Sequence, residues 1–346
     1  MITNRCNLRC PYCFAADFLN PHESDITDGN FYKAADFLLK DRGAVIGLIG
    51  GEPLLHPHIN DYILKLAEET DVSAVMLYTN GMLLTRVAGL FRSPSAASVL
   101  RILVNSNSPD VTGHKAYEKW LEQLDLVFNR YCMGRNIKFG INLYSNDLDY
   151  SYIEDVLLRF GQKQVRFSLT VPEFGCEGSR CTSLEDFKNR KDYLFEFYHS
   201  MAEIGVLAYA DCNKPPRCIW TDKEWEWICA YRRAFPNVAS NIADPDVSCR
   251  PVIDITTQLT AGRCFGLSSG GEVHIGDFKN PADLRKYFEI EYDSDMYRVP
   301  SDEACKECYG RKTGHCSGGC LGYKAAYKAQ AEHSSEEDTD LLKTYR

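Results

Sequence analysis

The sequence has 346 residues, of which 45% are hydrophobic and 25% charged, which is ordinary for a globular protein of roughly two domains. A net charge of −9 at pH 7 argues against strong binding to nucleic acid, which needs a basic surface. We find no apolar run of membrane-spanning length and no secretory signal, so we expect a cytoplasmic protein without a membrane partner.

The fifteen cysteines indicate metal ligation in a reducing compartment rather than disulfides. Cys6, Cys10 and Cys13 come first, in a C-x3-C-x2-C spacing. A [4Fe–4S] cluster normally takes four thiolates, so three close thiolates leave one iron open to a substrate or cofactor. The alternative is structural zinc, which favours paired C-x2-C knuckles and four closed ligands. The triplet therefore predicts a reactive iron–sulfur cluster.

Strand and helix patterns alternate over residues 1–205. The expected strands cover 1–5, 45–49, 75–78, 99–104, 137–143 and 165–171. The expected helices cover 27–40, 60–69, 82–91, 116–131, 153–160 and 187–204. Such alternation predicts a parallel sheet with right-handed crossovers, and six units are too few to close an eight-stranded barrel. We therefore predict an α/β fold with a partial (β/α)6 TIM-like barrel.

Functional groups of α/β barrels lie at the carboxyl ends of the strands. The segment Gly50-Gly51-Glu52-Pro53 follows the second expected strand, where glycine permits close backbone approach and a carboxylate can accept hydrogen bonds. Further polar residues stand at or near the following strand ends: Asn80, Asn105, Asn142 and Ser168. The alternative for each of them is a simple turn or helix cap.

Beyond residue 205 the pattern changes and the cysteines return. Cys249 precedes an expected strand at 252–255, and Cys264 follows the next loop, which predicts a β-hairpin between two ligands. A C-x2-C-x7-C-x3-C segment then supplies four more candidate ligands: Cys305, Cys308, Cys316 and Cys320. Zinc is an alternative for these four on spacing alone. We therefore expect a cysteine-rich second domain over 206–330 and a polar, mobile tail over 331–346.

Three other cysteines are not expected to be ligands. Cys132 lies near the end of an expected helix, where we interpret it as a buried small hydrophobe. Cys176 and Cys181 fall in an expected loop at the barrel mouth, and we interpret them as inert thiols, with gating of the substrate as the alternative.

The Cys6, Cys10 and Cys13 triplet resembles the signature of radical S-adenosylmethionine (SAM) enzymes. That resemblance implies that SAM chelates the open iron and that the cluster cleaves SAM to a 5′-deoxyadenosyl radical. It also implies that Gly50, Gly51 and Glu52 hold the amino group of SAM. Asn80, Asn105, Asn142 and Ser168 are then candidate SAM contacts, although relatives often read Ser-x-Asp-Gly where this sequence has Asn105-Ser106-Asn107.

The late cysteines resemble the SPASM or twitch extension of these enzymes, which binds auxiliary [4Fe–4S] clusters. The fit is partial, because one spacing is seven rather than five, no cysteine follows Cys320, and Leu259 occupies an expected glycine position. The resemblance implies that Cys249, Cys264 and Cys320 share one cluster, with Cys218 as a candidate fourth ligand. Cys305, Cys308 and Cys316 would hold another, which gives one or two auxiliary clusters.

The same resemblance favours modification of a ribosomally made peptide or protein by crosslinking, epimerisation, excision or oxidation. Expected partners are that substrate, a separate leader-recognition protein, and an electron donor such as flavodoxin or ferredoxin. One alternative is a radical SAM dehydrogenase or rearrangement enzyme acting on a small molecule. Another is an iron–sulfur scaffold or sensor without turnover.

Overall fold

The structure is a computed structural model. It describes residues 1–13, 19, 25–169, 184–212, 214–236, 249, 252–264, 272–300, 302–313, 316, 318–321 and 324. None of the helices in this described part combines the length and the apolar content needed to cross a membrane.

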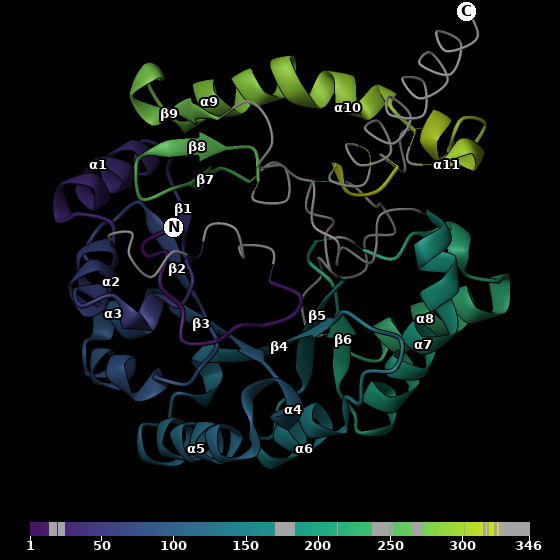
Figure 1. Cartoon of the computed structure of the whole chain (residues 1–346), viewed down its shortest axis with the longest axis horizontal. Coiled ribbons are helices and arrows are strands. Elements are labelled where there is room, and N and C mark those ends of the chain that lie inside the picture. Colours follow the sequence, from purple (N-terminus) through teal and green to yellow (C-terminus); the bar gives the residue numbers. More distant parts are fainter. Residues whose placement is uncertain are drawn as a thin grey trace, which may run out of the picture.

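Six parallel strands form the main sheet, in the order of the sequence. They are β1 (Ala44–Leu48), β2 (Val72–Thr79), β3 (Leu100–Ser106), β4 (Ile137–Leu143), β5 (Gln164–Leu169) and β6 (Leu207–Tyr209). The central strands place buried apolar residues on one face, as in β4, where Phe139 and Ile141 lie in the core and Lys138 and Asn142 on the opposite face are half-buried. Figure 1 shows the strands as an open arc, which confirms the predicted partial barrel.

Helices follow the strands and cover the outer side of this arc (Figure 1). They are α1 (Asp28–Leu38), α2 (Ile59–Ala67), α3 (Pro94–Val99), α4 (Pro109–Thr112), α5 (His114–Asp125), α6 (Ser151–Arg159), α7 (Leu184–Glu203) and α8 (Asp222–Arg233). Local sequence sets their starts. Thr27 caps α1 by accepting from Asn30 N, and Thr221 with Glu224 forms a capping box on α8.

The main sheet has six strands, as the sequence predicts, but one of them is a different segment from the one expected. Residues 1–5 are not a strand, because their backbone pairs with the loop after β1 instead of running along β1. Ile2 N donates to Ile49 O at 2.8 Å, and Gly51 N donates to Thr3 O at 2.9 Å. The last strand of the sheet is instead β6, which pairs with β5 and lies beyond the expected domain boundary at residue 205. Tyr231 of α8 secures it by donating to Val206 O and accepting from Ala208 N.

Two segments expected as α-helices contain a 3-10 helix or a π-helical turn in the structure. The segment expected as a helix over 82–91 is a 3-10 helix, η3 (Leu84–Arg92), followed by the short α3. The helix expected over 116–131 ends as α5 at Asp125 and continues as a π-helical turn, η4 (Leu126–Arg130). The other helix and strand predictions of the barrel are confirmed to within a few residues at each end.

A second, smaller sheet follows the barrel. It is antiparallel and consists of β7 (Asp254–Ile255), β8 (Thr260–Gly262) and β9 (Val273–His274). The first two strands confirm the predicted hairpin between Cys249 and Cys264. Helices α9 (Pro281–Phe288), α10 (Ser294–Arg298) and α11 (Tyr309–Lys312) come after it, with a π-turn η10 (Glu289–Asp293) between the first two.

The small sheet and α1 share a hydrophobic core. Phe37 of α1 is buried among Ile255, Leu259, Leu284 and Phe288. A hydrogen bond joins the same two parts of the chain, since Asn30 Nδ2 of α1 donates to Thr257 O at 3.1 Å. The first helix of the barrel therefore carries the second unit, and Figure 1 shows the small sheet and α9 above α1.

Candidate active site and cysteine sites

The first thirteen residues, here called the cluster loop, dock against the loop that follows β1. Glu52 N donates to Arg5 O at 2.8 Å. A Cβ atom on Gly50 would lie 2.4 Å from Thr3 O, and one on Gly51 would lie 2.3 Å from Arg5 O. Real Cβ atoms do not approach this closely, so both positions require glycine for the backbone of the cluster loop to dock.

The Glu52 side chain is fully buried and points back into the protein. Its Oε1 accepts from Leu54 N at 2.9 Å and from Thr79 Oγ1 at 2.7 Å, and its Oε2 accepts from Asn80 N at 2.8 Å. Burial raises the pKa of Glu52, and these three donors oppose the rise. This differs from the sequence-based expectation of an open acceptor, because the carboxylate ties the end of β2 to the loop after β1.

A chain of polar contacts runs from β5 to the cluster loop. Ser168 Oγ donates to Asn142 Oδ1, and Asn142 in turn hydrogen-bonds Tyr12. Tyr12 Oη and Cys10 Sγ both donate to Asn107 Oδ1, the sulfur at 3.6 Å. Burial raises the pKa of Tyr12 well above its usual range, so its hydroxyl stays a donor. These contacts place Cys10 at the carboxyl ends of β3, β4 and β5.

Two further strand-end asparagines occupy different surroundings. Asn80 Nδ2 donates to Asn7 Oδ1 of the cluster loop at 2.8 Å, and Asn80 Oδ1 accepts from Met82 N at 3.0 Å. Asn105 lies on β3 beside Gly140 of β4, where a Cβ would stand 3.0 Å from Asn105 Oδ1. Asn107, which follows β3, is buried and contacts both Tyr12 and Cys10.

The three thiols of the triplet are half-buried and close to one another. Burial raises the pKa of Cys6, and it raises the pKa of Cys10 to about 11 despite a hydrogen bond from Tyr12. Thiolates are the ligands of iron–sulfur clusters, so binding iron here would release protons. A donor set of sulfur alone, at the open end of a barrel, fits a cluster with one iron left for another ligand.

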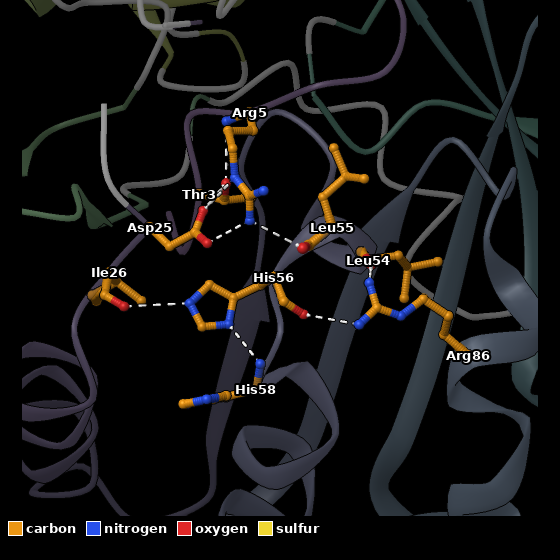
Figure 2. A network of polar contacts seen from close by, with 9 residues as sticks. All are labelled: Thr3, Arg5, Asp25, Ile26, Leu54, Leu55, His56, His58 and Arg86. Atoms are coloured by element: carbon orange, nitrogen blue, oxygen red, sulfur yellow. Dashed lines mark hydrogen bonds and ion pairs between the residues drawn. The ribbon is translucent and has the colours of Figure 1, made fainter. Parts of the chain in front are cut away.

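A polar network supports the loop behind this site (Figure 2). Arg5 Nε donates to Asp25 Oδ1 at 2.9 Å, and Arg5 Nη2 donates to Leu55 O at 3.1 Å. His58 N donates to His56 Nδ1 at 3.1 Å, which leaves the other ring nitrogen to donate to Ile26 O. Both groups fix the segment after Glu52, and His56 is a buried structural residue.

Four cysteines of the second unit line one cavity of about 50 Å³. They are Cys218, Cys305, Cys308 and Cys316. The backbone of Gly318 and Gly319 also lines it, and both glycines have a positive φ that lets the chain turn tightly around the cysteines. Burial and then the three neighbouring cysteines raise the pKa of Cys218 to about 11. We refer to these four residues as the first cysteine set.

Four other cysteines gather near the hairpin, and we call them the second cysteine set: Cys212, Cys249, Cys264 and Cys320. Cys320 is buried and hydrogen-bonded to both Cys212 and Cys249. The hydrogen bond with Cys320 is the main reason why the pKa of Cys249 is lowered to about 6, against the effect of burial. Leu321 N and the charge of Arg263 lower it further. Burial raises the pKa of Cys264 to about 12.

This grouping differs from the expected ligand wiring in two residues. Cys218 was expected beside Cys249, Cys264 and Cys320, but it lies in the first set because the 3-10 turn η6 (Arg217–Ile219) holds it there. The sequence analysis assigns no role to Cys212. It lies just after the end of β6 and belongs to the second set through its hydrogen bond with Cys320. Its only sequence signal was its place among the late cysteines.

The remaining cysteine predictions have mixed outcomes. Cys132 is exposed rather than buried, because it lies in a left-handed turn with φ of 54° after the π-turn η4. Cys176, Cys181 and the tail over 331–346 lie outside the described residues. Among the residues that are described, no three His, Cys, Asp or Glu side chains are grouped to hold a single metal ion.

Comparison with known proteins relates this site to a family. Residues 1–164 match the family model described as the Radical SAM superfamily. Molybdenum cofactor biosynthesis protein 1 of Bos taurus is 28% identical over 126 residues, which cover 35% of this chain and 20% of that protein. GTP 3',8-cyclase of Geobacter sulfurreducens is 32% identical over 113 residues, which cover 31% of this chain and 32% of that protein. The chain thus spans only about a fifth to a third of these relatives.

Solved structures with the same fold extend over more of the chain. Native anSMEcpe with bound AdoMet has a TM-score of 0.59 at 15% identity and covers 100% of this chain and 98% of its own. Streptococcus suis SuiB bound to precursor peptide SuiA has a TM-score of 0.54 at 16% identity and covers 92% of this chain and 70% of its own. The part of the chain that matches this family model, residues 1–164, contains the Cys6, Cys10 and Cys13 triplet and the strands β1 to β4.

Proposed function

We propose that this chain is a radical SAM enzyme in which Cys6, Cys10 and Cys13 hold the catalytic [4Fe–4S] cluster. The observation that supports this most is the contact of Cys10 with Asn107, which follows β3 and also accepts a hydrogen bond from Tyr12. When bound, the cluster and SAM supply a 5′-deoxyadenosyl radical that removes a substrate hydrogen atom.

The chain's own residues then position and shield these groups. Gly50 and Gly51 let the cluster loop dock, and Glu52 fixes the backbone of Asn80 beside it. We infer that Glu52 orients the backbone near the amino group of SAM, since its own carboxylate is already bonded to three donors.

Other strand-end residues complete the proposed SAM site. Asn142 and Ser168 hold Tyr12 in place, and Asn80 and Asn105 line the neighbouring strand ends. Figure 1 shows the sheet as an open arc, and the substrate is proposed to enter from its open side.

We further propose that the two cysteine sets hold auxiliary [4Fe–4S] clusters of a SPASM-type or twitch-type second domain. Each set offers four thiols, which is the number that a closed cluster takes. The sulfur-only donor sets and the cavity of the first set fit such clusters.

The proposed substrate is a ribosomally made peptide or protein. The likeness to anSMEcpe and SuiB supports this, because it covers nearly the whole chain and includes a complex with a precursor peptide. The proposed electron donor is a flavodoxin or ferredoxin, and leader recognition is assigned to a separate protein. The curated relatives favour a second candidate, a small nucleotide such as GTP, although their similarity covers only about a third of this chain.

One experiment separates the two substrate classes. The reconstituted protein is incubated anaerobically with SAM and dithionite, together with either GTP or the peptide fraction of the source cells. Formation of 5′-deoxyadenosine is measured, and a portion of the peptide fraction is treated with protease beforehand.

We expect the peptide fraction to stimulate 5′-deoxyadenosine formation and the protease to abolish this stimulation. A peptide of changed mass should then appear in the wild-type reaction and not with the Cys6→Ala/Cys10→Ala/Cys13→Ala variant. Stimulation by GTP, with none from the peptide fraction, would contradict the peptide proposal and favour the small-molecule candidate.

A further inference from the structure

Arg263 is a deeply buried charged side chain near the second cysteine set. It is 1% exposed, and its partner Asp293 is 2% exposed. Arg263 Nε lies 2.8 Å from Asp293 Oδ1, and Arg263 Nη2 lies 3.0 Å from Asp293 Oδ2. This is a fork-to-fork pair, which fixes the plane of the guanidinium group.

Stability alone is a poor reason for such a pair. Removing two charges from water costs about as much as their attraction returns, and apolar residues of similar volume often serve equally well. The position of Arg263 suggests a different reason. It directly precedes Cys264 at the end of β8, and its Nη2 lies 4.0 Å from Cys249 Sγ.

Part of this guanidinium has no partner within the described residues. Asp293 occupies Nε and Nη2, whereas Nη1 is buried and without a hydrogen-bond acceptor. A buried donor of a charged group that finds no acceptor destabilises the protein, so an acceptor is expected there. Sulfur is close to the same guanidinium, because its Nη2 contacts Cys249 Sγ and both Cys249 and Cys264 act on Arg263 electrostatically.

Two other charged groups, Asp254 and Lys324, act on the cysteines near this site. Asp254 of β7 acts electrostatically on Cys264, and Lys324 is buried with its Nζ 5.1 Å from the ring centre of Tyr297. Lys324 also acts on both cysteine sets, since Cys316, Cys305 and Cys249 all influence it. Within the described part of the chain, Arg263 is the cation that contacts a sulfur of the second set, Cys249 Sγ.

We propose that Arg263, oriented by Asp293, donates hydrogen bonds to the sulfur of an iron–sulfur cluster held by Cys212, Cys249, Cys264 and Cys320, and thereby makes that cluster easier to reduce. This inference rests on the proposed auxiliary clusters. Hydrogen bonds to sulfur and nearby positive charge stabilise the reduced, more negative state, and both are known determinants of cluster potential. Arg263 is therefore a positioning and tuning residue for this cluster.

The test uses the full chain carrying Cys6→Ala/Cys10→Ala/Cys13→Ala, so that only auxiliary clusters remain. In this background Arg263→Met/Asp293→Leu replaces the buried pair by apolar residues and leaves no unpaired charge. The control is Arg285→Met/Asp41→Leu, which removes another arginine–aspartate pair that joins α9 to the end of α1. Iron is counted, and each cluster is titrated with dithionite while its reduced state is followed by electron paramagnetic resonance.

We expect one of the two auxiliary potentials to fall in Arg263→Met/Asp293→Leu, with at least a tenfold weaker tendency to take up one electron, which is 59 mV. The control should leave both potentials unchanged. If the double variant does not retain the cluster, Arg263→Lys decides, since it keeps the charge without the fork and should shift the same potential by less.

Two results would overturn the proposal, and they are distinguishable. The first is that Arg263→Met/Asp293→Leu keeps its full iron content and unchanged potentials, which would show that Arg263 does not tune the cluster. Where Arg263→Lys decides, the same result in that variant has the same meaning. A background protein that binds no iron would instead remove the auxiliary clusters themselves, and this inference would fall with them.

Discussion

Glu52 shows how one buried carboxylate can connect two segments at the carboxyl ends of the strands. It joins the loop after β1, through Leu54 N, to the end of β2, through Thr79 Oγ1 and Asn80 N. The sequence predicts that this residue belongs to the site, because it follows a strand and two glycines. It could not predict the direction of the side chain, since that depends on donors that only the folded β2 brings within reach.

We predict that Glu52→Gln destabilises the protein by about 1–3 kcal/mol. In the wild type both carboxylate oxygens of Glu52 accept hydrogen bonds. Glutamine replaces one of these oxygens by an NH₂ group, so one buried donor loses its acceptor. Urea unfolding under anaerobic conditions measures the change. Glu118→Gln is the control, because Glu118 is exposed on α5 and should shift the unfolding free energy very little. Equal stability of the two variants would contradict this role of Glu52.

Leu259 and Cys212 mark the limits of sequence analysis at the same scale. Leu259 stands where glycine was expected, and it adopts that backbone conformation with φ of 65°. Burial of its side chain in the core of the small sheet offsets a cost of about 1–2 kcal/mol for the left-handed conformation. Cys212 joins the second set only because β6 ends beside it, which no spacing rule encodes.

At the scale of elements, the cluster loop and the end of β1 depend on each other. The loop has little regular structure, so its position is set by backbone hydrogen bonds to the segment over 49–52. Hydrophobic periodicity predicts β1 itself, whereas docking of residues 1–5 against its end is a contact between loops. This explains why the sequence predicts a strand there and the structure has none.

We predict that Gly51→Ala displaces the cluster loop. The new methyl group would meet Arg5 O at 2.3 Å and Cys6 Cβ at 2.9 Å, so the backbone must shift at a cost of about 1–3 kcal/mol. After anaerobic reconstitution this variant should hold fewer irons per chain than wild type. Gly89→Ala is the control, because no atom lies within 4 Å of its added Cβ. Full iron content and normal SAM cleavage in Gly51→Ala would argue against the proposed docking.

At the scale of the whole molecule, the barrel and the cysteine-rich unit are joined through α1. The alternation of strands and helices predicts the barrel, and the cysteine spacing predicts a separate unit. Neither pattern reveals that Phe37 of the barrel belongs to the core of the second unit. An amphipathic helix shows which residues it buries, but not which neighbour covers them.

We predict that Phe37→Ala loosens the second unit by about 3–5 kcal/mol and leaves the barrel folded. The variant should lose auxiliary iron while it keeps the iron bound by the triplet. Tyr32→Ala on the same helix is the control, because Tyr32 is 43% exposed. Iron counts with and without the triplet substitutions distinguish the two pools. Unchanged auxiliary iron in Phe37→Ala would show that α1 is not needed to hold this unit.

The most direct test of the central claim is SAM cleavage by the anaerobically reconstituted protein, with and without Cys6→Ala/Cys10→Ala/Cys13→Ala. We expect the wild type to form 5′-deoxyadenosine under reducing conditions and the triple variant to form none. About eight irons per chain should remain in the variant, as two auxiliary [4Fe–4S] clusters require. Iron-loaded wild-type protein that never cleaves SAM would contradict the catalytic assignment and favour a cluster-binding scaffold.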